Sequence, residues 1–373
     1  MHAAVICGRR EPMRIAFVMP EISPRPVGGA KAVYRYATEL AARGHQVTVL
    51  HPRRSVLAGF RQRFDHDSAF EPAHLAPQPW YQLGERVVDW VIDDIAADAL
   101  PGDFDVIIAN NCRVVAAMTG FSERLGRKVY FLQDYESFQI GDAQHRAETL
   151  GLLRIDWPVI VSSPAARRLV ESASGRPCLM VRRAIDTDQF RAITPLDSPL
   201  RTTIGFPARS ERTKCTGDAI RALEIARTRL PRSTGFWCYG YERPRALPSW
   251  ITHHLAPTDQ ELCASYNRSC VFLVPSRWEG FGQPGAEAMA CGVALVSTRN
   301  GGVDTYATDG ESAILCAPGR PAELAAAALC LYESESSRLR IARTGAAAAA
   351  RLTWTAAADA LDALLRTICA SRG

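Results

Sequence analysis

Short runs of apolar residues alternate with stretches whose apolar positions recur at helical spacing through the first half of the chain. The helical type is clearest at residues 32–44, which end on Gly44. The other runs carry Val and Ile without strict alternation, which is typical of strands covered on both faces of a parallel sheet. They occupy residues 13–20, 45–52, 104–111, 128–134 and 157–163. This alternation predicts a doubly wound α/β domain.

The alternation stops over residues 188–202, which contain two prolines and no periodicity, and then resumes. We expect strands at 202–209, 235–240, 270–276, 293–298 and 312–318, with helices at 215–229, 259–267, from about 283, and in the alanine-rich end of the chain. This pattern predicts an N-terminal domain over 1–190, with 1–12 as a frayed extension, and a C-terminal domain over 200–373. The last helix is expected to return to the N-terminal domain. Ligands are expected at the carboxyl ends of the strands and in the cleft between the domains.

Composition narrows the class of protein without deciding it. The chain has 373 residues, 47% of them hydrophobic and 22% charged, which is ordinary for a soluble globular enzyme. A net charge of +5 suits a ligand that carries phosphate. The 11 cysteines are scattered with no C-x-x-C pair, which predicts reduced thiols, a cytosolic protein and no metal site. No apolar run approaches the roughly 18 residues that span a bilayer.

One basic segment with interspersed apolar residues, at 53–64, leaves membrane contact open. It could rest on an anionic lipid surface, which would place the protein at the inner face of a membrane. Alternatively, it is a solvated loop or helix, which is more common for such a segment. We expect no nucleic-acid partner.

Two glutamates stand eight positions apart around a glycine-rich turn. Glu279 follows a predicted strand and Glu287 falls one turn into a predicted helix. Between them, Gly280 and Gly282 permit positive φ angles and close approach of backbone to a ligand, and Pro284 suits the first turn of the helix. A strand, a glycine turn and a helix N-terminus together form an anion site. Carboxylates on either side of it suit the hydroxyls of a nucleotide-sugar. Alternatively, the two glutamates are a turn cap and an exposed first-turn acid.

The stretch from 274 to 302, VPSRWEGFGQPGAEAMACGVALVSTRNGG, resembles the signature of glycosyltransferase family 4, which comprises retaining enzymes with the GT-B fold and an E-x7-E motif. The similarity continues at 257–276, 205–223, 183–190 and 24–50, and so covers most of the chain. It is stronger in the C-terminal half. The resemblance implies two Rossmann-like domains that face each other across a cleft.

The resemblance also implies roles for particular residues. Glu287 would hold the ribose hydroxyls and Glu279 the hydroxyls of the transferred sugar. The turn formed by Gly280, Phe281, Gly282 and Gln283 would bind the diphosphate with its amides, and Arg209 and Lys214 would neutralise that group as it leaves. Gly28 and Gly29, which precede a predicted helix, would contact donor phosphate or acceptor, although a plain tight turn explains them equally well.

The stretch QDYE at 133–136 resembles a bacterial subset of the family that is associated with rhamnosyl transfer from dTDP-rhamnose. Asp134 and Glu136 would then contact acceptor or sugar; as an alternative, they are surface carboxylates. Two departures from the family stand out. Many members of the family carry a histidine in this neighbourhood that contacts the donor sugar. No histidine occupies 133–136 here, and His145 is a poor substitute for one. Asp304 stands where a glutamate is usual.

The leading hypothesis is therefore a retaining glycosyltransferase in bacterial glycan or glycoconjugate biosynthesis. It would move a sugar from a nucleotide-diphosphate donor to a glycan, lipid-linked or small-molecule acceptor. The resemblance implies front-face attack, in which the leaving phosphate accepts the proton, without metal or cofactor. A second hypothesis is a catalytically degenerate nucleotide-sugar-binding protein that acts as a partner or regulator. A nicotinamide-dependent dehydrogenase is disfavoured because the chain lacks the dinucleotide fingerprint.

Overall fold

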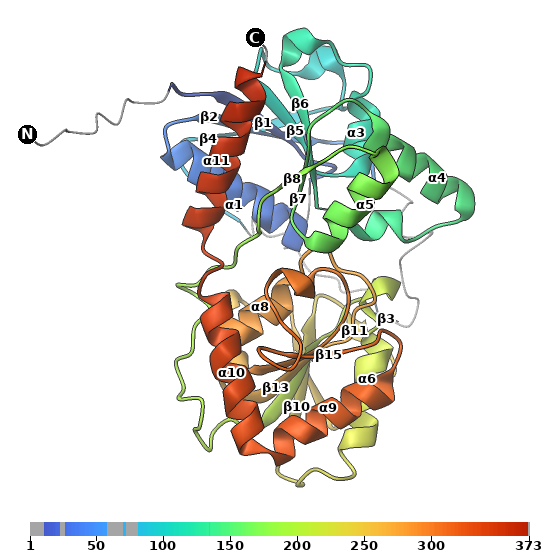
Figure 1. Cartoon of the computed structure of the whole chain (residues 1–373), viewed down its shortest axis with the longest axis vertical. Coiled ribbons are helices and arrows are strands. Elements are labelled where there is room, and N and C mark those ends of the chain that lie inside the picture. The colour runs from blue at the N-terminus through green and yellow to red at the C-terminus, as the bar shows by residue number, and fades with distance from the viewer. Residues whose placement is uncertain (1–10, 23–26, 58–69, 72–80, 134, 372–373) are drawn as a thin grey trace, which may run out of the picture.

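The computed structural model describes residues 11–22, 27–57, 70–71, 81–133 and 135–371. Two α/β domains lie one above the other, each built around a parallel sheet (Figure 1). The two-domain α/β architecture predicted from the alternating pattern is confirmed. Of the first twelve residues, 1–10 lie outside the described part of the chain, as does 58–64 of the basic segment.

The first sheet has seven parallel strands in the order β4-β2-β1-β5-β6-β7-β8. Their bounds are β1 Arg14–Val18, β2 Gln46–Pro52, β4 Val87–Ile92, β5 Val106–Ala109, β6 Arg127–Leu132, β7 Val159–Val161 and β8 Leu179–Met180. The helices are α1 Gly28–Ala42, α3 Cys112–Met118, α4 Ala143–Gly151 and α5 Pro164–Ser174. In β1, Ile15 and Phe17 pack in one core while Ala16 and Val18 pack in another, so the strand is buried on both faces. This explains its unbroken apolar run.

The second sheet has six parallel strands in the order β12-β10-β9-β13-β14-β15. Their bounds are β9 Thr203–Pro207, β10 Gly235–Gly240, β12 Ile251–Leu255, β13 Ser269–Val274, β14 Ala294–Thr298 and β15 Ile314–Cys316. The helices are α6 Thr216–Ala226, α7 Asp259–Asn267, α8 Gln283–Ala290, α9 Pro321–Glu333 and α10 Glu335–Ala349. Thr258 and Glu261 form a capping box that starts α7.

Short elements complete the chain. Among the described residues, the 3-10 helices are η1 Ala97–Ala99, η2 Glu123–Leu125, η3 Tyr135–Phe138, η4 Leu152–Arg154, η5 Arg212–Lys214 and η6 Val303–Thr305. A two-stranded antiparallel pair joins β3 Phe70–Glu71, from the first half of the chain, to β11 Arg243–Pro244 of the second. This pair of short strands therefore makes a contact between the two domains.

The C-terminal helix α11, Trp354–Ala370, packs on the first domain and not on the second. Figure 1 shows it beside α1. Its residues Leu361 and Leu365 are fully buried in the first-domain core. Asp359 pairs with Arg43 of the first domain at 2.7 Å. The chain thus crosses between the domains twice, once through 181–202 and once between α10 and α11.

Three strands of the two parallel sheets were not predicted from the sequence, and the helix predicted at 32–44 begins earlier than expected. β4 lies at the sheet edge with four exposed residues, β12 carries two histidines, and β8 has only two residues, so none has a run of buried apolar side chains. The helix predicted at 32–44 starts at Gly28, because Val27 is extended and leads directly into it.

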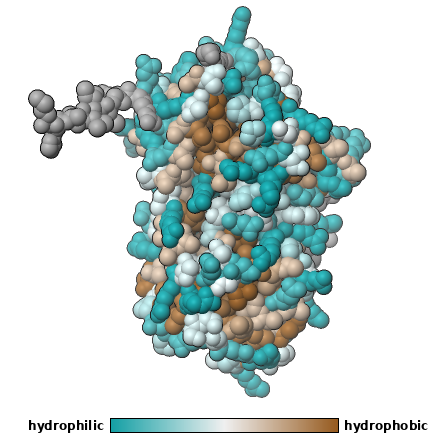
Figure 2. All heavy atoms as spheres, viewed as in Figure 1, coloured by the Kyte–Doolittle hydropathy of each residue, from teal (hydrophilic) through white to brown (hydrophobic). Residues whose placement is uncertain are grey.

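The surface in Figure 2 is mostly hydrophilic, with separate hydrophobic patches over both domains, as is usual for a globular protein. No helix among the described residues has the length and apolar character needed to cross a membrane.

Candidate functional site

A cavity of about 310 Å³ lies between the domains, at the carboxyl ends of the strands of both sheets. Met19 follows β1 and Gln133 follows β6 on the first-domain side, while Arg209 follows β9 and Ser276 follows β13 on the other. Every predicted site residue within the described part of the chain lines this cavity: Gly28, Gly29, Glu136, Arg209, Lys214, Glu279, Gly280, Phe281, Gly282, Gln283 and Glu287. Asp134 lies outside the described residues.

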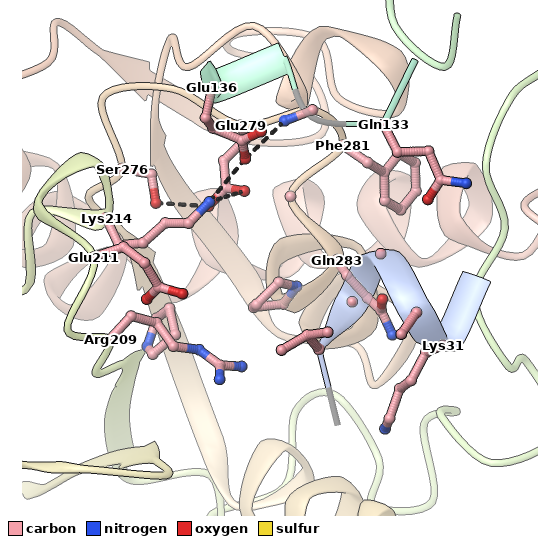
Figure 3. Close-up of a pocket in the computed structure, with 18 of the residues that line it drawn as sticks. Lys31, Gln133, Glu136, Arg209, Glu211, Lys214, Ser276, Glu279, Phe281 and Gln283 are labelled. Atoms are coloured by element: carbon pink, nitrogen blue, oxygen red, sulfur yellow. Dashed lines mark hydrogen bonds and ion pairs between the residues drawn. The ribbon is translucent and has the colours of Figure 1, made fainter. Parts of the chain in front are cut away.

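A lysine bridges two glutamates at one end of the cavity (Figure 3). The Lys214 ammonium, on η5, donates to Glu136 Oε1 at 2.9 Å and to Glu279 Oε2 at 2.8 Å. Burial opposes the charge on Lys214, but the two carboxylates outweigh burial and raise its pKa above the ordinary value. The hydroxyl of Ser276 donates to Glu279 Oε1 at 2.7 Å. Both oxygens of Glu279 are therefore engaged.

A second acid lies at the other end of the cavity. Glu287, on α8, is 4% exposed and accepts a hydrogen bond of 2.6 Å from the Gln283 amide. Burial raises the pKa of Glu287 to about 7, and Lys31 and Gln283 offset only part of that effect. Lys31 itself, in the first turn of α1, donates to Asp259 at 2.8 Å across the domain boundary. A carboxylate that is buried and incompletely compensated is suited to accept hydrogen bonds from a ligand.

The glycine turn joins these two ends. Gly282 has φ +84°, so its positive φ requires glycine or a strained residue. Gly280 is not among the positive-φ glycines; a Cβ there would lie 2.8 Å from the carbonyl oxygen of Gln133. Gly280 is therefore needed for close approach of the other domain, and the expectation of positive φ holds only for Gly282. Pro284 falls in the first turn of α8 as predicted.

The stretch NGG, at 300–302, supports the glycine turn on the side away from the cavity. The Glu279 N–H donates to Asn300 O at 2.9 Å. Gly302 packs against the backbone of Phe281, which a Cβ would meet at 2.6 Å. The Phe281 side chain is 2% exposed, in the core of the second domain. Only its backbone is therefore placed to bind a ligand by hydrogen bonds.

Arg209 extends from the end of β9 into the cavity below Lys214 (Figure 3). Its guanidinium carbon lies 5.6 Å from the ring centres of both Tyr239 and Tyr241. Its backbone N–H donates to Thr216 Oγ1 at 2.9 Å, which fixes the residue against the start of α6. The two predicted basic residues thus share one wall of the cavity with Glu279.

Gly28 and Gly29 are the first residues of α1 and bring its N-terminus to the cavity. Arg183 joins this helix to the glycine turn: its guanidinium donates to Gly28 O and, at 2.9 Å, to Gln283 Oε1. Burial lowers the pKa of Arg183. Its Nε has no hydrogen-bond partner.

Several cavity residues were missed from the sequence: Lys31, Gln133, Arg183, Glu211 and Asp259. All five stand inside stretches that resemble the family, but nothing in their spacing distinguishes them. His145 lies on α4, away from the cavity lining, with Arg113 at 3.0 Å from its Nδ1. Asp304 is exposed on η6 and does not line the cavity. No cluster of three metal-ligating side chains occurs among the described residues.

A comparison with protein families finds a match in the second half of the chain. Residues 201–334 match the sequence model of the family described as glycosyl transferases group 1. The match is confined to the second domain. A D-inositol 3-phosphate glycosyltransferase of Corynebacterium jeikeium is 28% identical over 56% of this chain. The alignment spans 57% of that relative, so this chain matches little more than half its length.

Solved structures extend the likeness to both domains. Sucrose-phosphate synthase from Thermosynechococcus elongatus superimposes with a TM-score of 0.75 at 17% identity, over 97% of this chain and 100% of that one. The Anabaena protein Alr3699/HepE, in complex with UDP-glucose, gives 0.72 at 17% identity, over 95% and 100%. The fold is GT-B, as the resemblance predicted.

Proposed function

We propose that this chain transfers a sugar, with retention of configuration, from a nucleotide-diphosphate donor to a hydroxyl-bearing acceptor. The observation that carries the proposal is the position of Lys214. This cation lies between carboxylates of both domains, beside a glycine turn and helix N-terminus that suit a diphosphate. The match of the second domain to glycosyl transferases group 1 and the fold shared with a UDP-glucose-binding protein support the same class of reaction.

The nucleoside end of the donor is assigned to Glu287. Its side chain is buried, its pKa is raised to about 7, and Gln283 provides its 2.6 Å hydrogen bond. Two ribose hydroxyls would supply the further hydrogen bonds that its ionised form lacks. Binding of the nucleoside should therefore lower the pKa of Glu287.

The diphosphate is assigned to Lys214, Arg209 and the amides of the turn before α8. Lys214 is paired with Glu136 and Glu279, so the phosphate would enter by exchange with the first-domain carboxylate. Preorganised cations of this kind stabilise the charge that develops on a leaving group. The pair therefore supplies the electrostatic part of catalysis, without a step that requires a metal ion.

Glu279 is assigned to hydroxyls of the transferred sugar and not to nucleophilic attack. One of its oxygens accepts from Lys214 and the other from Ser276. A carboxylate held on both sides is a poor nucleophile but a rigid positioning group. Front-face transfer follows, in which the departing phosphate accepts the proton of the acceptor hydroxyl as the new glycosidic bond forms.

Rhamnose from dTDP-rhamnose is our candidate for the transferred sugar, on the likeness of the QDYE stretch, and a bacterial glycan or lipid-linked glycan is our candidate for the acceptor. We place the reaction in the cytoplasm, at the inner face of the membrane where lipid-linked acceptors reside. The acceptor would face the donor from the first-domain wall, where Glu136 lines the cavity.

A thermal-shift panel of dTDP-, UDP- and GDP-sugars tests the proposal. A donor at a hundredfold over its dissociation constant should stabilise the protein by roughly 2.7 kcal/mol. The stabilising donor should then be hydrolysed or transferred, at an undiminished rate in the presence of a chelator. Stabilisation without turnover in any acceptor screen would favour the degenerate binding protein instead. Trapping a sugar covalently on Glu279 would contradict the assigned mechanism.

A further inference from the structure

Gln133 carries an unexplained pair of polar atoms at the edge of the cavity. It follows β6 directly and lines the cavity on the first-domain side. Its side-chain oxygen and nitrogen are both buried, and neither has a hydrogen-bond partner. Buried amides in folded proteins are nearly always paired, because an unpaired one loses its hydrogen bonds to water without replacement. Such an exception needs a cause.

A role in stability does not supply that cause. An amide without partners packs no better than an apolar side chain of the same size, and it adds a desolvation penalty. Methionine or leucine would fill the same space at lower cost in folding free energy. The unpaired amide is accounted for if a ligand completes its hydrogen bonds.

The surroundings of Gln133 indicate where such a ligand would lie. A Cβ on Gly29 would be 4.0 Å from Gln133 Oε1, and a Cβ on Gly280 would be 2.8 Å from its carbonyl oxygen. Gln133 is therefore flanked by the N-terminus of α1 and by the glycine turn, both built from residues without side chains. In Figure 3 its side chain lies next to Phe281, on the side away from the group formed by Glu136, Lys214 and Glu279.

Given the proposed function, the nucleoside lies at Glu287 and the phosphates lie at Lys214 and Arg209. The part of the donor left to meet Gln133 is the sugar. We propose that the Gln133 amide binds a ring hydroxyl of the transferred sugar and determines which neutral sugar the cavity accepts. A hydroxyl both donates and accepts, and so does an amide, so one group can satisfy both unpaired atoms. Because both amide atoms are buried in this structure, we expect the Gln133 side chain to rotate toward the cavity when the sugar binds.

Affinity for a nucleotide-sugar compared with affinity for its nucleotide tests this assignment. The probes are UDP and UDP-glucose, dTDP and dTDP-rhamnose, and GDP and GDP-mannose, and the pair that binds the unmodified protein most tightly is carried forward. Gln133→Ala should weaken binding of the nucleotide-sugar by roughly tenfold or more, and binding of the nucleotide by less than about twofold. Gln144→Ala, on the exposed face of α4, is the matched control and should change neither.

Gln133→Met keeps the volume of the side chain and serves where the alanine variant folds poorly. It should reproduce the selective loss, since methionine lacks the amide. Equal affinities for nucleotide-sugar in the methionine variant and the unmodified protein would overturn the assignment, as would equal losses for nucleotide and nucleotide-sugar. If the unmodified protein binds no nucleotide at all, the proposed function itself fails, which is a distinct result.

Discussion

The two ends of the cavity are built from the same kinds of residue in opposite arrangements. At one end Lys214 of the second domain lies between Glu279 of its own domain and Glu136 of the first. At the other, Lys31 of the first domain pairs with Asp259 of the second, with Glu287 nearby. The difference lies in burial: the side chain of Lys214 is 18% exposed and its partners 20% and 12%, whereas Asp259 is 48% exposed.

Burial decides what each end can do. Coulomb attraction is strong among largely desolvated groups and weak among solvated ones. The Lys214 end is therefore a fixed electrostatic site suited to phosphate. At the other end, the Glu287 carboxylate is incompletely compensated, and the neighbouring Lys31–Asp259 ion pair is screened by water. Substitutions at the two ends should therefore have effects of different size and different dependence on pH.

The largest effect is expected from Lys214→Ala. Removal of this cation leaves the leaving diphosphate without its buried partner, so kcat should fall by about 100- to 1000-fold, as for the loss of one preorganised group. The free energy of unfolding should also fall, by about 1–3 kcal/mol, because Glu136 and Glu279 lose their common partner. Steady-state kinetics and denaturant unfolding measure the two effects.

Lys128→Ala separates those two effects. Lys128 is also a buried lysine, with Glu123 at 2.5 Å, but it does not line the cavity. Its loss should destabilise the fold while leaving kcat/KM within about twofold. A Lys214→Ala enzyme that keeps more than a tenth of its activity would contradict the account of this end.

An intermediate effect is expected from Glu287→Gln, and it depends on pH. The pKa of Glu287 is raised from 4.5 to about 7, so the folded protein binds a proton that the unfolded chain has lost between those values. The free energy of unfolding should therefore decrease as the pH rises from about 4.5 to about 7, by on the order of 3 kcal/mol. Glutamine should remove that decrease, which urea unfolding at a series of pH values would show.

Nucleotide affinity should change in the opposite sense. Ribose hydroxyls donate to the ionised carboxylate, so affinity should rise with pH through about 7 in the unmodified protein. In Glu287→Gln the affinity should be roughly tenfold lower at pH 8 and independent of pH over this range. A variant that keeps the same rise in affinity with pH would show that another group titrates.

The smallest effect is expected from Lys31→Ala. Its pair with Asp259 is partly solvated, with side chains 25% and 48% exposed, so its loss should change stability by less than about 1 kcal/mol. Removal of this cation near Glu287 should raise the pKa of that carboxyl further. The rise in nucleotide affinity should therefore move to higher pH, which calorimetric titration at several pH values can detect.

Much of the fold and of the second-domain wall could be predicted from the sequence. Buried strands such as β1 and β13 have continuous apolar runs, and the glutamates and the glycine turn stand within a single strand–turn–helix unit. Local sequence fixes such a unit, so the positions of Glu279, Gly282 and Glu287 relative to one another follow directly from it.

The contacts between the domains could not be predicted in this way. Glu136 meets Lys214 across 78 residues, and Lys31 meets Asp259 across 228. Those contacts depend on how the two domains face each other, and the local pattern of apolar and polar residues does not determine that arrangement. For the same reason the close approach of Gln133 to Gly280 was not predicted: the sequence suggested positive φ and close approach of a ligand at this glycine, and not close approach of the other domain. The edge strand β4 was missed because its side chains are mostly exposed.

A crystal structure with the donor identified in the thermal-shift panel tests the central claim most directly. We predict the ribose hydroxyls within hydrogen-bond distance of Glu287, the diphosphate on Lys214 and Arg209 in place of Glu136, and a sugar hydroxyl on Glu279. A donor bound outside the interdomain cavity would contradict the account, as would one bound within it with its phosphates away from Lys214.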